Sequence, residues 1–214
     1  MKAVVFDVDG VLVDSEPHSR RAWVEVLGSH GVSITTDDVE AFTGSGFSAT
    51  YDGLVGDAEG LPSPESIWPE LQEALARSFG EGLRVFEDAA DALRRLAFEG
   101  VPVAVATASP RSRLDLTLEQ TDLGRFVMAS AAGDEVDRSK PAPDVYLLAA
   151  ERLGTEPGRC VAVEDTPTGA RSALAAGMRV MGVARRPEDV GPLLRAGAAA
   201  SSAVDYDALV AWLD

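Results

Sequence analysis

The sequence contains little cysteine and no long apolar run. Its single cysteine, Cys160, cannot form an internal disulfide, so we expect a reducing, cytoplasmic compartment. The first apolar run, residues 3–6, is too short for a signal peptide, and no run approaches the ~20 apolar residues of a membrane helix. We therefore expect no membrane association, and no feature predicts an obligate protein partner.

Basic residues are scarce, and one long segment has none. The chain has 19 Lys and Arg against 35 Asp and Glu, which gives a net charge of −16. This balance argues against nucleic acid as a partner, because phosphate backbones need a basic face. Residues 22–76 contain neither Lys nor Arg. Only Lys2 and Lys140 are lysines, so Lys140 indicates a role that needs a compact ammonium group.

Short apolar runs alternate with amphipathic patterns along most of the chain. Strands are predicted at residues 3–6, 101–106, 160–163 and 179–183, and helices at residues 88–99, 141–154 and 168–177. This alternation predicts an α/β fold whose core is a doubly wound, Rossmann-like parallel sheet. Residues 16–81 show only helical patterns, so we predict a helical cap there, inserted after the first strand, with residues 1–15 and 82–214 forming the core.

Polar residues gather where the predicted strands end. The first strand is followed by Asp7, Asp9 and Gly10, the second by Thr107 to Ser109, and a later one by Glu164 and Asp165. Ligands of open parallel sheets bind beyond these carboxyl ends. Crowded carboxylates need a cation, and Mg²⁺ prefers such oxygen ligands together with substrate phosphate. Each pair alone is a weak signal, but together they predict a Mg²⁺ site.

Four segments together resemble the haloacid dehalogenase superfamily over essentially the whole chain. They read VVFDVDGVLVDSEP, VATAS, GDEVDRSKPAPDVYLLAAERLG and VEDTPTGARSALAAGM. The subgroup they resemble contains β-phosphoglucomutase and the small sugar-phosphate and phosphoglycolate phosphatases, which carry a helical cap after the first strand. The resemblance implies a phosphoric monoester hydrolase that acts on a small phosphomonoester.

The resemblance also implies roles for the acidic residues. Asp7 would attack phosphorus and form an aspartyl-phosphate, and Asp9 would act as general acid and then as general base. Mg²⁺ would be held by Asp7, the backbone carbonyl of Asp9, and Asp165. Glu164 would either bind the ion directly or contact the residues that bind it. True dehalogenases lack the second aspartate, so Asp9 favours phosphate chemistry.

Further residues would contact the phosphoryl group or the rest of the substrate. Lys140, Thr107 and the amide of Ala108 would neutralise or bind phosphoryl oxygens. The other predicted substrate-binding residues are Gly10, Ser109, Arg111, Gly44, Ser45 and Gly46.

The segment FTGSGFSATYDGL departs from the mutase pattern because it has no cation to hold a second phosphate. We therefore expect a phosphatase for substrates with a neutral, polyol-like or cationic leaving group, and place a phosphomutase second. A catalytically silent binding or regulatory protein on the same fold is a third possibility, although Asp7, Asp9, Lys140 and Asp165 are all retained. We interpret His18 as an exposed polar residue. Arg185 and Arg186 could reach the mouth of the site, but we interpret them as parts of a solvated loop.

Overall fold

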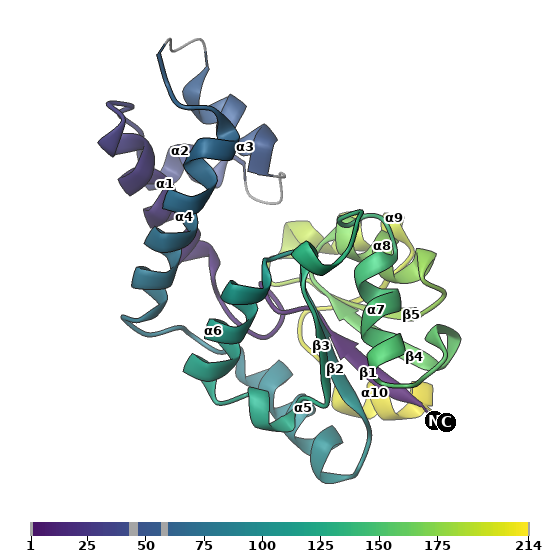
Figure 1. Cartoon of the computed structure of the whole chain (residues 1–214). Helices are drawn as coiled ribbons and strands as arrows, with labels where there is room; N and C mark the ends of the chain where they lie inside the picture. The colour runs from purple at the N-terminus through teal and green to yellow at the C-terminus, as the bar shows by residue number, and fades with distance from the viewer. Residues whose placement is uncertain (1, 43–46, 57–59, 214) are drawn as a thin grey trace. The chain divides into compact units, whose positions relative to one another are not determined.

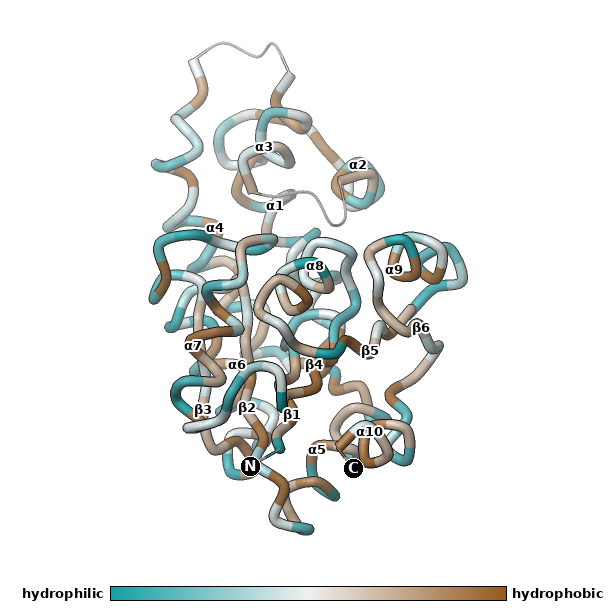
Figure 2. The backbone as a smooth tube through the Cα atoms, turned by 90° about the vertical axis from the view of Figure 1, so that its right-hand side faces the viewer, coloured by the Kyte–Doolittle hydropathy of each residue, from teal (hydrophilic) through white to brown (hydrophobic). Residues whose placement is uncertain are grey.

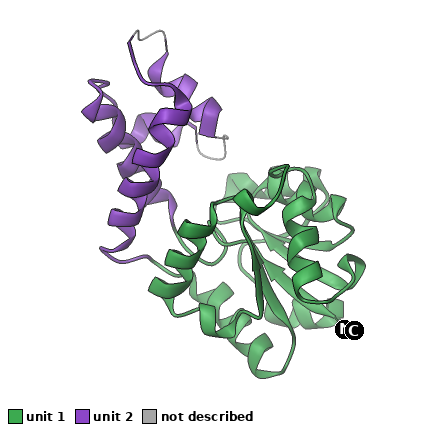
Figure 3. Ribbon diagram, in the orientation of Figure 1, with its two compact units in different colours: residues 1–14, 84–214 green, residues 15–83 purple. Residues whose placement is uncertain are grey.

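The computed structural model describes residues 2–42, 47–56 and 60–213 and divides into two compact units (Figures 1 and 3). Unit 1 contains residues 1–14 and 84–214, and unit 2 contains residues 15–83. Among the described residues, no helix is both long enough and apolar enough to cross a membrane.

A six-stranded parallel sheet in the order β3-β2-β1-β4-β5-β6 forms the centre of unit 1. Its strands are β1 (Ala3–Phe6), β2 (Val103–Ala106), β3 (Ala129–Ala131), β4 (Cys160–Glu164), β5 (Arg179–Val183) and β6 (Ala199–Ser201). Strands β1, β2 and β4 are buried along their full length, and the apolar colour of the sheet can be followed in Figure 2. This strand order confirms the predicted doubly wound fold class. The first strand, β1, lies at the centre of the sheet between β2 and β4.

Helices cover the sheet because its central strands β1, β2 and β4 carry apolar residues that are buried on both faces. The helices of unit 1 are α5 (Glu87–Phe98), α6 (Arg111–Thr121), α7 (Asp144–Arg152), α8 (Pro167–Ala175), α9 (Val190–Ala196) and α10 (Tyr206–Leu213). Ala3 and Val5 of β1 belong to a core cluster with Tyr146 of α7 and Ala170 of α8. The alternate residues Val4 and Phe6 are equally buried, and α5 and α10 contact β2 and β4.

Short strands and several helices were not predicted. Strands β3 and β6 have only three residues each, and their Ala and Ser side chains carry little β-forming signal. The predicted helix at residues 141–154 begins at Asp144, after a loop that contains Lys140. In this loop Lys140 lies near the carboxyl ends of the strands, beside Asp7 and the carbonyl of Ala106.

Unit 2 is helical throughout the residues described in it. Its helices are α1 (Glu16–Ser29), α2 (Thr36–Glu40), α3 (Phe47–Val55) and α4 (Pro64–Phe79). Thr35 begins α2 with a capping box, since its side chain accepts from the amide of Asp38 while Asp38 accepts from the amide of Thr35. Helices α1 and α4 pack together, and Trp23, Ile67 and Phe79 are buried between elements of this unit.

Candidate active site

The loop after β1 places two aspartates at the carboxyl end of the sheet. Asp7 continues the strand, since its amide donates to the carbonyl of Val163 at 2.9 Å, and it is 6% exposed. Gly10 follows with a φ of +83°, the left-handed region that favours glycine. A Cβ added at Gly10 would lie 1.9 Å from Oδ2 of Asp165. Glycine therefore permits both the turn and the close approach of Asp165.

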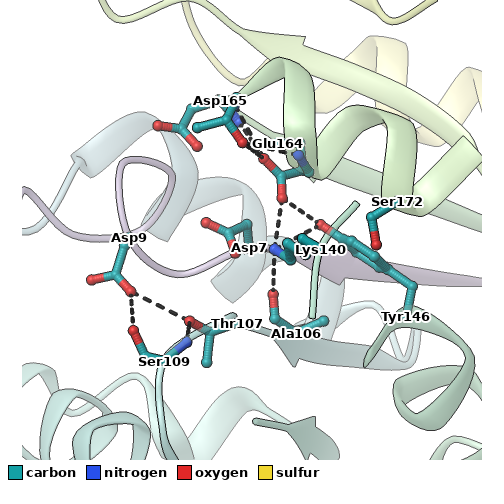
Figure 4. A network of polar contacts seen from close by, with 12 residues as sticks. Asp7, Asp9, Ala106, Thr107, Ser109, Lys140, Tyr146, Glu164, Asp165 and Ser172 are labelled. Atoms are coloured by element: carbon teal, nitrogen blue, oxygen red, sulfur yellow. Dashed lines mark hydrogen bonds and ion pairs between the residues drawn. The ribbon is translucent and has the colours of Figure 1, made fainter. Parts of the chain in front are cut away.

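Lys140 connects two of the buried carboxylates (Figure 4). Its Nζ lies 2.6 Å from Oδ1 of Asp7 and 2.7 Å from Oε1 of Glu164, and its side chain is 8% exposed. It also donates to the carbonyl of Ala106 at 3.2 Å. The Tyr146 hydroxyl donates to the same Glu164 oxygen at 2.9 Å, and Nζ lies 4.9 Å from the centre of the Tyr146 ring. The ammonium group thus has one well-defined position beside Asp7.

Glu164 uses both carboxylate oxygens within the protein. While Oε1 accepts from Lys140 and Tyr146, Oε2 accepts from the amides of Asp165 and Thr166 and from the Thr166 hydroxyl, each at 3.1 Å. A Cβ at Gly169 would lie 1.7 Å from Oε1, so this glycine leaves space for the carboxylate against α8. Because both of its oxygens already accept bonds within the protein, Glu164 is better suited to hold Lys140 in place than to bind a metal ion directly.

Three carboxylates converge beside this lysine. Single oxygens of Asp7, Glu164 and Asp165 all lie within 4.8 Å of one another. Burial raises the pKa of Asp7 to about 8, an effect that Lys140 opposes and that the charges of Glu164 and Asp9 reinforce. Burial, with the charges of Glu164 and Asp7, also raises the pKa of Asp165 well above its usual value. One ammonium group does not neutralise this cluster.

A divalent cation fits the electrostatics and the donor atoms of this cluster. Oδ1 of Asp165 is buried and has no hydrogen-bond partner within the described parts of the chain. A buried polar oxygen without a hydrogen-bond partner is costly unless a ligand engages it. Because all the converging donors are oxygens, the cluster suits a hard cation such as Mg²⁺.

Asp9 faces a different group of residues. Its Oδ2 accepts from the Ser109 hydroxyl at 2.9 Å and from the Thr107 hydroxyl at 3.3 Å, as Figure 4 shows. Its Oδ1 lies 2.7 Å from Nη2 of Arg113. Thr107 is buried after β2, and its hydroxyl also accepts from the amide of Ser109. The turn after β2 therefore holds Asp9, while Lys140 holds Asp7.

The remaining residues predicted to bind substrate lie in different surroundings. Ala108 is exposed in the turn after β2. The Arg111 guanidinium contacts Glu135 and donates to the Ser130 hydroxyl at 2.9 Å and to Asp115 at 3.2 Å. Gly44, Ser45 and Gly46 lie outside the described residues.

Sequence reasoning missed Arg113 and Tyr146, and misread Arg185 and His18. Arg185 donates to the carbonyls of Gly10 at 3.0 Å and Val11 at 2.7 Å, so it holds the loop after β1 rather than belonging to a solvated loop. The reading of His18 as exposed was also wrong. It is 7% exposed, its Nδ1 lies 2.8 Å from the Ser78 hydroxyl, and its ring meets the ring of Phe79 edge to face.

Known proteins resemble this chain in sequence and in structure. The sequence model of haloacid dehalogenase-like hydrolases matches residues 1–177. A phosphorylated carbohydrates phosphatase of Thermotoga maritima is 33% identical over 211 residues, which cover 94% of this chain and 93% of the relative. Fructose-1-phosphate phosphatase YqaB of Escherichia coli is 32% identical over 181 residues, which cover 84% of this chain and 95% of the relative. The crystal structure of a HAD family hydrolase from Deinococcus radiodurans R1, with bound phosphate and sodium, has a TM-score of 0.75 and 34% identity, and the match covers 100% of this chain and 95% of that one.

Proposed function

The chain belongs to the haloacid dehalogenase-like hydrolase family, and we propose that it is a phosphatase that hydrolyses a small phosphorylated metabolite. The observation that carries the proposal is the position of Asp7. It directly follows β1 at the carboxyl edge of the sheet, where Lys140 binds one of its oxygens and Asp165 lies close by. A nucleophile, a fixed positive charge and a set of hard oxygen ligands are the parts that phosphoryl transfer needs.

The proposed reaction has two steps. A carboxylate oxygen of Asp7 bonds to phosphorus while the bond from phosphorus to the leaving oxygen breaks, and Asp9 gives that oxygen a proton. Water then attacks phosphorus, Asp9 accepts the water's proton, and the bond between Asp7 and phosphorus breaks. Lys140 and the hydroxyl of Thr107 would offset the charge on the phosphoryl oxygens.

Mg²⁺ is the proposed cofactor of this site. Asp7, Asp165 and the backbone carbonyl of Asp9 would hold the ion, and Glu164 would position Lys140 or complete the ligand set. When bound, the ion would supply positive charge that neutralises phosphoryl oxygens and the carboxylate cluster. The buried oxygen of Asp165 supports this assignment.

The test of the proposed function is phosphate release from a panel of phosphomonoesters, with Mg²⁺ or with EDTA. We expect release that depends on Mg²⁺ from at least one member of the panel. No release from any phosphomonoester would contradict the proposal. Conversion of a hexose 1-phosphate to the 6-phosphate, without net release, would instead support the mutase.

We expect the panel to favour sugar or polyol monophosphates. The relatives from Thermotoga maritima and Escherichia coli are phosphatases of a phosphorylated carbohydrate and of fructose 1-phosphate. We propose that unit 2, as a cap, selects the leaving group. Its cations are three arginines near its ends, of which Arg20 pairs with Glu40 at 2.8 Å and Arg77 with Glu25 at 2.7 Å. A second anionic group would therefore be disfavoured, and strong selectivity for phosphoglycolate or a sugar bisphosphate would contradict this ranking.

Stabilisation by Mg²⁺ should increase with pH. The folded-state pKa of Asp7 is raised to about 8 from 3.8, so the metal-free folded protein holds a proton that the unfolded chain has released. The free energy of unfolding in EDTA should therefore fall as pH rises from about 5.5 to about 8. Because Mg²⁺ binds the ionised carboxylates, its addition should raise the melting temperature more at about pH 8 than at about pH 5.5.

Thermal unfolding with and without Mg²⁺ across this range measures the effect. Asp91→Asn is a matched control, since this acid of α5 lies outside the site and has a side chain that is 71% exposed. It should reproduce the pH dependence of the wild type. If Mg²⁺ raised the melting temperature by the same amount at every pH, the proposed link between metal binding and carboxylate ionisation would be contradicted.

A further inference from the structure

Arg113 contacts Asp9, the residue proposed to act first as general acid and then as general base. It lies in the first turn of α6, and its Nη2 is 2.7 Å from Oδ1 of Asp9. The two side chains are 16% and 27% exposed, so water screens this pair less than it would on an open surface. The hydroxyls of Ser109 and Thr107 donate to the other Asp9 oxygen. Both oxygens of Asp9 are thus held by residues of one segment, 107–113.

We propose that Arg113 is a positioning residue that fixes the Asp9 carboxyl for proton transfer at the leaving group. This inference rests on the proposed phosphatase function. Asp9 lies in the loop after β1, and its own side chain allows several rotamers. A charge-assisted bond to one oxygen and hydroxyl bonds to the other select a single orientation. The segment after β2 thereby sets where the Asp9 carboxyl group lies relative to the Asp7 nucleophile.

The neighbouring arginine does not share this contact. Arg111, two residues earlier on α6, is directed to Glu135, Asp115 and Ser130. Two residues correspond to a rotation of about 200° around a helix, so the two guanidinium groups leave α6 in different directions. The residues of α6 that are buried are Leu114 and Thr117. Loss of the Arg113 guanidinium should therefore leave the packing of α6 intact.

The proposal predicts an effect that depends on the leaving group. A sugar or polyol phosphate releases an alkoxide that needs the Asp9 proton, whereas p-nitrophenyl phosphate releases a stable anion that needs it little. We expect Arg113→Gln to lower kcat for the alkyl substrate by about 10- to 100-fold, with KM changed much less, because misplaced catalytic groups cost about this much. The loss in kcat/KM with p-nitrophenyl phosphate should be several-fold smaller, because this ratio reports the step in which the leaving group departs and not the later hydrolysis, in which Asp9 serves as base for both substrates. Arg113→Lys should recover part of the activity.

A double-substitution experiment separates positioning from a general structural role. In an Asp9→Asn background, Arg113→Gln should have no further effect on either substrate, because the group it positions is already absent. Arg125→Gln is the matched control: Arg125 is 63% exposed beside Asp122, and its replacement should change neither kinetic parameter. Melting temperatures of all variants establish that they are folded.

Three results would overturn the inference. They are equal losses in kcat/KM with alkyl and aryl substrates, a loss that persists undiminished in the Asp9→Asn background, and a change confined to KM. The last would assign Arg113 to substrate binding. Failure of the proposed function is distinguishable from all three, since the wild type would then release no phosphate from either substrate.

Discussion

Asp7→Asn should abolish phosphate release while leaving the protein folded. The amide has nearly the size of the carboxyl group but cannot act as the nucleophile, so turnover should fall by at least about 10⁴-fold, the range seen when a nucleophile is removed from a cooperative site. Burial already raises the pKa of Asp7 to about 8, which means that the site accepts a neutral side chain at this position. Lys140 would retain Glu164 as its partner at 2.7 Å.

Two measurements distinguish loss of the nucleophile from a less specific defect. Rapid acid quenching during turnover, followed by peptide mass spectrometry, should find a phosphoryl group on the peptide that contains Asp7 in the wild type, and none in the variant. Asp115→Asn, a change at an exposed position of α6, should keep wild-type turnover. If Asp7→Asn released phosphate at the wild-type rate, the assignment of the nucleophile would be wrong.

Much of the candidate site follows from sequence because it depends on strand ends. A buried apolar run predicts a strand without any knowledge of its neighbours, and a parallel sheet brings the ends of all its strands to one edge. That reasoning places Asp7, Thr107 and Glu164 close together, and the structure brings these residues to the same edge. The strands β3 and β6 could not be predicted in this way, because three residues are too few to show a run or an alternation of apolar side chains.

The residues that position the site could not be found in this way. Arg113 and Arg185 act through long side chains, and a sequence does not show where their guanidinium groups are directed. Arg111 and Arg113 look equivalent in the sequence, yet only Arg113 contacts Asp9, because the phase of α6 decides between them. His18 was misread because its burial depends on Ser78 and Phe79, which lie about 60 residues later in the chain.

Lys140→Met should cost the protein both activity and stability. The lysine is the shared partner of Asp7 and Glu164, at 2.6 and 2.7 Å, and methionine would keep much of its length without the charge. Two buried carboxylates would then face each other without a cation, and removing one partner of a buried ion pair costs about 3–5 kcal/mol. Turnover should fall by about 10²-fold or more, because a fixed positive charge beside the phosphoryl group would be lost.

Urea unfolding in EDTA measures the loss of stability without a contribution from a bound ion. Arg138→Gln is the matched control, since Arg138 also binds an acid, Asp144, but its side chain is 68% exposed, and the change should have little effect. The cost of Lys140→Met should decrease as the pH falls below about 8, because burial raises the pKa of Asp7 to about 8 and its carboxyl then takes up a proton. A cost that does not vary with pH would indicate lost packing instead of lost charge.

The double variant Lys140→Met/Glu164→Gln provides the sharpest test of this electrostatic account. Replacing Glu164 by its neutral amide removes one of the two carboxylates that Lys140→Met leaves unpaired, while Tyr146 can still bond to the new side chain. The free energy of unfolding should therefore recover in part relative to Lys140→Met, although Glu164→Gln alone should destabilise the protein. Turnover should not recover, since the charge that faces the phosphoryl group is still absent. Stability that fell further in the double variant would show that Glu164 stabilises the fold through Thr166 and Asp165 more than through Lys140.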